Sequence, residues 1–230
     1  MQLVVDIGSQ KLNAGLFEGD RFLQASLLTP EQLLEFLKGK TIQQSLIASQ
    51  DENKSRGVMS LLTAQGVPCR VLTPANFKRL ATDETLSLLQ PDRIANIFGA
   101  LYHFPSNDCV IVDVGATVRL DYITKQGVYL GGAVFSNQLK DFLESSQKVL
   151  GENQLEQTKS GAYFGLMGAI ERIVAELRLS SETPSAVMSI ATGGLTSLPA
   201  VQKDLEDFID KVDPHLTLVG LNQILKEEKL

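Results

Sequence analysis

The sequence predicts an α/β protein made of two similar lobes. A pattern of three aliphatic residues, Asp, an aliphatic residue and Gly occurs twice, at Leu3–Gly8 and at Val110–Gly115. Each copy is followed by a polar stretch and a second apolar run, at 14–17 and at 120–123. Apolar, β-branched runs that end at Gly are typical of buried strands, and strands that alternate with helices are typical of α/β architecture. We therefore expect two related lobes that face one another.

The first lobe is expected to continue as an alternation of helices and strands. Pro30–Leu37 has helical spacing, and Pro30 is suited to a first helical turn. Short strands are predicted at Gln44–Ser49 and Cys69–Leu72, with a helix at Asn53–Gln65 between them. A further helix begins in the segment Gln90-Pro91-Asp92-Arg93 and continues through Leu101.

The second lobe is expected to begin after a turn at Pro105–Asp108, so that the lobes cover residues 1–104 and 105–230. Glycines at 127, 131 and 132 indicate a hairpin. The later segments are expected to be helices at Ser136–Leu150 and Gln157–Leu177, a strand at Ala186–Ala191, a helix at Leu198–Val212, a strand at Leu216–Val219 and a helix at Leu221–Leu230. The last helix is one that could pack back on the first lobe.

Composition argues against several classes of protein. The 230 residues are 43% hydrophobic and 21% charged, as in ordinary globular proteins, and the net charge of −6 disfavours an extended nucleic-acid surface. The apolar runs are far shorter than the roughly 20 residues of a membrane span, and the first residues lack a signal-peptide pattern. Two cysteines and two histidines show no metal-ligand spacing. We expect a cytoplasmic protein with no nucleic-acid and no membrane partner.

Asp6 and Asp113 end the two duplicated strands. A carboxylate at the carboxyl end of a strand lies where open α/β sheets bind ligands. Gly8 and Gly115 allow a tight turn, in which backbone N–H groups can point at phosphate oxygens. Because carboxylates repel phosphates, either Asp implies a bound cation. The alternative is that each Asp caps a turn, but the duplication favours a phosphate site.

Two further motifs are candidates for binding. Paired glycines in Thr192-Gly193-Gly194 follow a predicted strand and would let a flat group such as adenine approach the backbone, although a turn into a helix explains them equally well. Asp92-Arg93 at a helix start combines a potential general base with an anion-binding guanidinium, although Asp is also a common helix cap. The glycine-rich patterns of dinucleotide-binding and P-loop proteins are absent from the sequence.

In order along the chain, these motifs resemble those of the type III pantothenate kinase family. Its Asp-x-Gly-Asn-Thr-x-x-Lys, Gly-x-Asp-Arg and Asp-x-Gly-Thr-Ala-x-Thr-x-Asp correspond to residues 6–13, 90–93 and 113–121. Its Gly-Gly, Ser-Gly-x-x-x-Gly and Thr-Gly-Gly correspond to residues 131–132, 160–165 and 192–194. The resemblance implies the duplicated actin-like ATPase fold of the acetate-kinase/hexokinase/actin superfamily, with two ribonuclease-H-like lobes and mixed sheets, and it implies a homodimer.

The resemblance also implies an activity and a set of site residues. The family phosphorylates pantothenate to 4'-phosphopantothenate with ATP, the first step towards coenzyme A, and uses Mg²⁺ and a monovalent cation, K⁺ or NH₄⁺. Carried over, Asp92 is the base for the pantothenate hydroxyl, Arg93 binds the pantothenate carboxylate, Gln154 stands at a substrate-contacting position and Asp113 holds the monovalent cation. The ATP site would comprise Asp6, Gly8, Ser9, Gln10, Lys11, Gly115, Ala116, Gly193 and Gly194.

Several positions depart from the family motifs, so the chain resembles a divergent member. In the first loop Ser9-Gln10 replaces Asn-Thr and Asn13 stands where Lys is usual, while in the second loop Ala116 and Arg119 replace Thr. Losing one hydrogen bond to a charged group costs about 1.5–3 kcal/mol, unless Lys11 or Arg119 compensates. The sequence therefore leaves three functions open: a pantothenate kinase, a catalytically impaired relative that binds nucleotide or a partner as a regulator, or a kinase for another small hydroxyl substrate.

Overall fold

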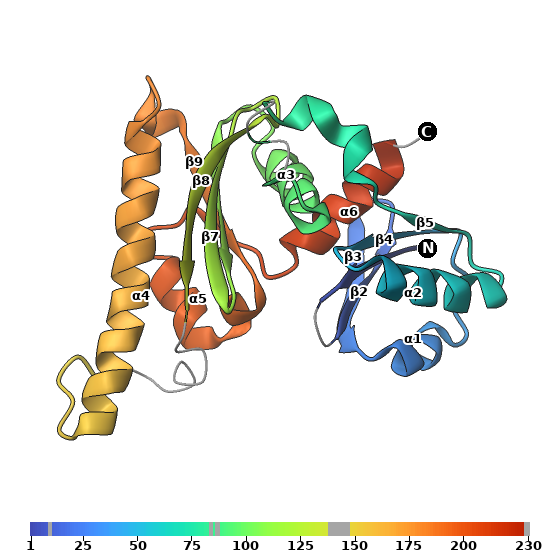
Figure 1. The fold of residues 1–230 in the computed structure, drawn as a ribbon, viewed down its shortest axis with the longest axis horizontal. Coiled ribbons are helices and arrows are strands. Elements are labelled where there is room, and N and C mark those ends of the chain that lie inside the picture. Colours follow the sequence, from blue (N-terminus) through green and yellow to red (C-terminus); the bar gives the residue numbers. More distant parts are fainter. Residues whose placement is uncertain (9–10, 83–84, 86–87, 138–147, 228–230) are drawn as a thin grey trace. The chain divides into compact units, whose positions relative to one another are not determined.

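The chain forms two compact units, each built around one five-stranded sheet (Figure 1). A computed structural model describes all residues except 9–10, 83–84, 86–87, 138–147 and 228–230. The first unit is Met1–His103 together with His215–Leu230, and the second is Phe104–Pro214. The chain passes between the units next to the turn expected at 105–108. The last segment, which the lobe boundaries 1–104 and 105–230 assign to the second lobe, groups with the first unit.

The sheet of the first unit has the strand order β3-β2-β1-β4-β5. Its strands are β1 Gln2–Ile7, β2 Leu12–Glu18, β3 Arg21–Leu28, β4 Gln44–Ser49 and β5 Cys69–Val71. The first three form an antiparallel meander, whereas β4 and β5 run parallel to β1. This pairing brings the carboxyl ends of β1 and β4 side by side, with Ile7 opposite Ser49.

Helices cover both faces of this sheet, which explains why β1 is apolar along most of its length. The helices are α1 Pro30–Leu37, α2 Glu52–Ala64, α3 Pro91–His103 and α6 Leu216–Glu227, with a 3₁₀ helix at Pro74–Leu80. On one face Leu3 and Val5 pack with Leu33 of α1 and Leu62 of α2 in one buried cluster. On the other face α6 packs on β1 and β4, and α3 packs along α6.

The second unit repeats the arrangement, with the strand order β10-β9-β6-β7-β8. Its strands are β6 Cys109–Val114, β7 Thr117–Ile123, β8 Tyr129–Ser136, β9 Met188–Thr192 and β10 Lys211–Val212. Again the first three form an antiparallel meander and the other two run parallel to the first. The duplicated sequence pattern therefore corresponds to a duplicated strand topology, in which each Asp lies near the carboxyl end of the central strand and each Gly directly follows that strand.

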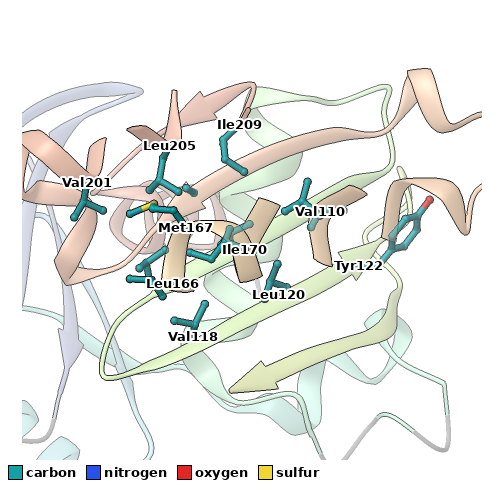
Figure 2. Packing of buried hydrophobic residues seen from close by; sticks show 14 of the residues in the cluster. Val110, Val118, Leu120, Tyr122, Leu166, Met167, Ile170, Val201, Leu205 and Ile209 are labelled. Atoms are coloured by element: carbon teal, nitrogen blue, oxygen red, sulfur yellow. The ribbon is translucent and has the colours of Figure 1, made fainter. Parts of the chain in front are cut away.

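Two helices, α4 Gln154–Leu179 and α5 Pro199–Leu205, pack against the second sheet, with 3₁₀ helices at Pro184–Ala186 and Gly194–Ser197. Figure 2 shows Leu166, Met167 and Ile170 of α4 packed with side chains from the strands and from α5. In the described helices of the chain, none combines the length and the apolarity that crossing a membrane requires.

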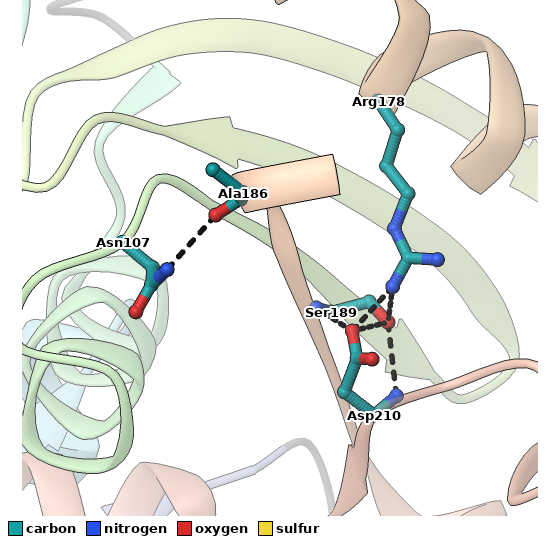
Figure 3. A network of polar contacts seen from close by, with 5 residues as sticks. All are labelled: Asn107, Arg178, Ala186, Ser189 and Asp210. Atoms are coloured by element: carbon teal, nitrogen blue, oxygen red, sulfur yellow. Dashed lines mark hydrogen bonds and ion pairs between the residues drawn. The ribbon is translucent and has the colours of Figure 1, made fainter. Parts of the chain in front are cut away.

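A polar network joins the end of α4 to two strands of the second sheet (Figure 3). Asp210, just before β10, accepts hydrogen bonds from the Ser189 N–H at 2.7 Å and from the Ser189 hydroxyl at 2.9 Å. The Arg178 guanidinium donates to the same Asp210 oxygen and, at 2.8 Å, to the Ser189 hydroxyl. The network anchors the short strand β10 beside β9.

Two expectations for the second half of the chain are wrong. The strand expected at Leu216–Val219 and the helix after it form one helix, α6, because the apolar run packs against α3 rather than entering a sheet. The helix expected at Leu198–Val212 ends at Leu205, and its last residues form β10. Ser136 ends β8, and most of the helix expected at Ser136–Leu150 lies outside the described residues. The edge strand β3 was not predicted.

Candidate functional site

A pocket of about 260 Å³ lies at the carboxyl ends of β1 and β4 in the first unit. Asp6 and Gly8 of the first Asp–Gly loop line it, together with Asp92 at the start of α3. These residues are far apart in the sequence, and the parallel pairing of β1 with β4 and the start of α3 bring them together. The other lining residues are Ile7, Ser49, Gln50, Asp51, Lys54 and Pro91.

Asp92 projects from the first turn of α3, where Pro91 begins the helix. Its Oδ1 accepts a hydrogen bond from the Gln50 amide at 3.4 Å, so a residue that follows β4 orients the carboxylate. The side chain is half-buried at the pocket wall. This position gives Asp92 access to a ligand in the pocket, as general-base chemistry requires.

Arg93, expected beside Asp92 as an anion-binding residue, is not among the described residues that line this pocket. Its side chain is buried, and its Nη1 donates a hydrogen bond to the Leu88 carbonyl at 3.0 Å. Neighbouring residues on a helix project about 100° apart, so Asp92 and Arg93 do not share a face. In the structure Arg93 supports the segment that leads into α3.

Lys54, on the first turns of α2, is the site residue that the sequence analysis missed. Its Nζ donates to the Gly8 carbonyl at 3.4 Å, and it is the one basic residue among those described as lining the pocket. It also lines a second, more apolar pocket of about 320 Å³, which adjoins the first at Gly8 and which Lys11 lines as well. The rule that ligands bind at the carboxyl ends of parallel strands, applied to β4, would have pointed to this helix start.

The Asp–Gly loops are closed by their own backbones. The Gly8 N–H donates to the Lys11 carbonyl at 3.0 Å, and the Gly115 N–H donates to the Thr117 carbonyl at 3.3 Å. Neither glycine has a positive φ. These two amides therefore hold the loops in shape, and N–H groups directed at a ligand must come from other residues. Ser9 and Gln10, expected at the ATP site, lie outside the described residues.

In the second unit Gly193 packs against Asp113. The backbone φ of Gly193 is +99°, and a Cβ atom there would lie 2.5 Å from Asp113 Oδ1 and 2.6 Å from the Val114 carbonyl oxygen. Both the left-handed conformation and the close approach require glycine. At Gly194, which begins the 3₁₀ helix, an added Cβ would meet no atom within 4 Å. The structure thus places the glycine pair beside the second Asp–Gly loop, as a binding site at the ends of β6 and β9 requires.

Asn137 fastens the second loop. Its N–H donates to the Ala116 carbonyl at 2.8 Å, and its side-chain amide donates to the Gly115 carbonyl at 3.2 Å. The side chain is 7% exposed. The side-chain amide of Asn137 therefore adds a hydrogen bond of its own to the one that its backbone makes with the second loop.

Asp113 and Arg119 form an ion pair across β6 and β7. They are directly opposite in the strand register, and Asp113 Oδ2 lies 3.9 Å from Arg119 Nη1. The side chains are 25% and 30% exposed, respectively. With a guanidinium facing Oδ2 and Gly193 packed on Oδ1, the carboxylate does not offer the open oxygen donor set that a monovalent cation needs. The residues present do not fit the cation expected at Asp113.

Gln154, expected at a substrate-contacting position, is the first residue of α4 and is exposed. Its backbone carbonyl accepts a hydrogen bond from the Thr158 hydroxyl at 2.8 Å. Further along α4, added Cβ atoms at Gly161, Gly165 and Gly168 would meet no atom within 4 Å. Packing of the described residues therefore does not explain these glycines.

Comparisons with known proteins agree with the motifs. The model of the type III pantothenate kinase family matches residues 2–176. A protein named type III pantothenate kinase from Finegoldia magna is 27% identical over 262 residues, which cover 96% of this chain and 95% of the relative. The relative of the same name from Legionella pneumophila strain Paris is 26% identical, with 96% of each covered. A third, from Parafrankia sp., is 31% identical over 150 residues, and the match spans 59% of this chain and 57% of the relative.

Solved structures with similar folds are more distant in sequence. The activator of the 2-hydroxyisocaproyl-CoA dehydratase from Clostridium difficile, with bound ADPNP, has a TM-score of 0.56 at 11% identity and covers 99% of this chain and 94% of its own. MreB 5 of Spiroplasma citri, bound to AMPPNP, has a TM-score of 0.51 at 10% identity, with 99% and 96% covered. These similarities show that the chain has the duplicated actin-like ATPase fold.

Proposed function

We propose that this chain, which belongs to the type III pantothenate kinase family, transfers the γ-phosphate of ATP to the hydroxyl group of pantothenate. The product is 4'-phosphopantothenate, on the path to coenzyme A. The observation that carries the proposal is the pocket that combines Asp6 and Gly8 with Asp92 and Lys54. It contains a potential phosphate loop, a potential base and a cationic side chain within one unit.

Asp92 is the proposed general base. Its carboxylate accepts the proton of the pantothenate hydroxyl while the hydroxyl oxygen bonds to the γ-phosphorus and the bond to the β-γ bridging oxygen breaks. Gln50 donates a hydrogen bond to Oδ1 and so orients the carboxylate for this proton transfer. Phosphoryl transfer depends mainly on positioning and electrostatic stabilisation, and Asp92 adds general-base assistance to these effects.

Lys54 is the proposed phosphate-binding residue of the first unit. Three carboxylates, Asp6, Asp51 and Asp92, line the pocket, and Asp51 Oδ1 is used to cap α2 by accepting the N–H groups of Asn53 and Lys54. A polyphosphate entering this pocket needs positive charge, which Lys54 provides within reach of Gly8. Mg²⁺ is usually held by one or two carboxylates together with phosphate oxygens. Asp6 fits this role, and the ion would neutralise phosphate charge there.

For the second unit we propose that Gly115, Ala116, Gly193 and Gly194 contribute the remaining contacts to ATP. The close approach of Gly193 to the end of β6 supports this assignment. Arg93 and Gln154 stay proposed substrate residues on the strength of the motif alone. We further propose a cytoplasmic homodimer, and the open Cβ positions of Gly161, Gly165 and Gly168 on α4 support close packing of a second copy.

The test is formation of phosphopantothenate by the purified chain with ATP, Mg²⁺ and pantothenate. Asp92→Asn should lower turnover by roughly 10²–10⁴-fold, the usual contribution of a general base, while binding of a non-hydrolysable ATP analogue is retained. Glu52→Gln, an exposed change on α2, is the matched control and should leave turnover unchanged. ATP binding without any turnover would favour a regulator, and turnover with other alcohols but not with pantothenate would select a different kinase.

A further inference from the structure

The two units place different residues opposite their duplicated Asp. In the second unit Asp113 on β6 faces Arg119 on β7, and in the first unit Asp6 on β1 faces Asn13 on β2. Side chains directly opposite each other in an antiparallel pair start about 4.5–5.5 Å apart at Cβ. The strand register therefore keeps the guanidinium beside the Asp113 carboxylate without depending on a flexible loop.

The surroundings of this pair favour a permanent interaction. Both side chains are more than two-thirds covered, so water screens the two charges less than it would on an open surface. An arginine stays protonated at any physiological pH, and its five N–H donors can serve a carboxylate and a phosphate at the same time. The turn at Gly115–Ala116, a proposed phosphate-binding segment, joins the two strands that carry the pair.

Building on the proposed function, we infer that Arg119 provides the positive charge that the family resemblance assigns to a monovalent cation at Asp113. Nucleotide binding by this chain is then independent of K⁺. A guanidinium near Oδ2 repels a second cation, while Gly193 covers the side of Oδ1. Arg119, rather than a bound cation, offsets the negative charge of Asp113 beside a bound polyphosphate.

The test compares nucleotide binding in two salts. Affinity for the Mg²⁺ complex of AMPPNP is measured by calorimetry in potassium chloride and in choline chloride at equal ionic strength. For the unmodified chain the dissociation constants should agree within about twofold. For Arg119→Thr, the affinity in choline should fall by roughly tenfold or more, as expected for loss of a charge-assisted contact, and K⁺ should restore it. Arg119→Lys should stay close to the unmodified chain.

Thallium(I), a probe for K⁺ sites, gives a readout that needs neither turnover nor nucleotide. The unmodified chain should show no saturable thallium binding by ²⁰⁵Tl NMR, and Arg119→Thr should gain it. Saturable binding to the unmodified chain, or K⁺-dependent AMPPNP affinity, overturns the inference, and both measurements hold even if the variant fails to fold. AMPPNP binding that does not depend on K⁺, without formation of phosphopantothenate, would support this inference and contradict the proposed function. Formation of phosphopantothenate that requires K⁺ would support the proposed function and contradict this inference.

Discussion

Gly220 of α6 lies against Ala95 of α3 so closely that a Cβ atom on Gly220 would be 1.7 Å from the Ala95 carbonyl oxygen. Gly99 of α3 makes the reciprocal approach, because a Cβ there would lie 2.6 Å from the Leu216 carbonyl oxygen. Two glycines thus set the distance between the helices that cover one face of the first sheet. This sheet carries the Asp6–Gly8 loop, so the packing of α3 against α6 supports the sheet on which the candidate site is built.

Replacing Gly220 with Ala should destabilise the protein by about 1–3 kcal/mol or more, since overpacking forces backbone shifts. Urea unfolding followed by circular dichroism measures the change. Gly57→Ala on α2 is the matched control, because its Cβ would meet no atom within 4 Å. There the better helix propensity of Ala should stabilise the protein by about 0.5–1 kcal/mol. Equal effects at the two positions would contradict the packing described for α3 and α6.

Lys54→Ala should lower kcat/KM for ATP by more than it lowers the stability of the fold. Loss of a hydrogen bond to a charged phosphate costs about 1.5–3 kcal/mol, which is roughly a 10–100-fold loss in kcat/KM for ATP. Steady-state kinetics with varied ATP, at saturating pantothenate, measure it. The control is Arg56→Ala on the same helix, since Arg56 pairs at 3.5 Å with Glu52 on an exposed surface. A similar loss in both variants would point to general electrostatics rather than to a phosphate contact.

Much of the fold follows from patterns that are local in sequence. The runs ending at Asp6 and Asp113 predict their strands because three consecutive aliphatic residues fit a strand buried on both faces. The helix expected at Pro30–Leu37 is confirmed, and Thr29 caps it with a capping box. The run Leu216–Val219 misleads because four apolar-rich residues suit a strand or a helix, and the choice depends on burial against α3.

The candidate site is less predictable than the fold. Asp92 can be proposed from its motif, but its hydrogen bond with Gln50 depends on how α3 packs against β4. The role of Lys54 depends on the parallel pairing of β1 with β4, which no local pattern of residues 50–56 reveals. Arg119 can be recognised from the sequence as a departure from the family motif. Its pairing with Asp113, in contrast, follows only from the register of β6 and β7.

Asp210→Ala should destabilise the second unit. The substitution removes the acceptor for the Ser189 N–H and hydroxyl and leaves Arg178 without its carboxylate (Figure 3). Hydrogen bonds to a charged group contribute about 1.5–3 kcal/mol, so the free energy of unfolding should fall by at least that amount. Glu176→Gln breaks an exposed ion pair with Arg172 on the same helix and should change stability by less than about 1 kcal/mol. Thermal or urea unfolding measures the loss of stability in each variant, and similar losses in both would contradict the role given to Asp210.

Alkaline pH should destabilise the protein through Cys109. Burial raises the pKa of the Cys109 thiol to about 12, and the nearby charges of Asp108 and Asp210 add to the rise. In the unfolded chain the thiol ionises near its ordinary pKa of about 8.5. The unfolded state therefore loses its proton first, and this group lowers the free energy of unfolding by up to about 1.4 kcal/mol per pH unit above that value. Below pH 8 it has almost no effect.

Cys109→Ala removes this pH dependence and serves as the comparison. The stability difference between the unmodified chain and the variant should be constant from pH 6 to pH 8. It should then shift in favour of the variant by about 1–2 kcal/mol by pH 10. Urea unfolding at each pH measures it, and parallel stability curves up to pH 10 would show that the thiol ionises as readily in the folded protein as in the unfolded chain.

The first unit is assembled from two stretches of chain, because α6 returns to it after the whole of Phe104–Pro214. During translation, the second unit is therefore complete before its predecessor has received the helix that lies along α3. The apolar face of α3 stays exposed on the nascent chain while more than a hundred further residues are made. We expect chaperones to bind this face of α3 mainly during that interval. The Asp6–Gly8 loop is therefore translated first, but the helices that cover its sheet are completed only when α6 is made.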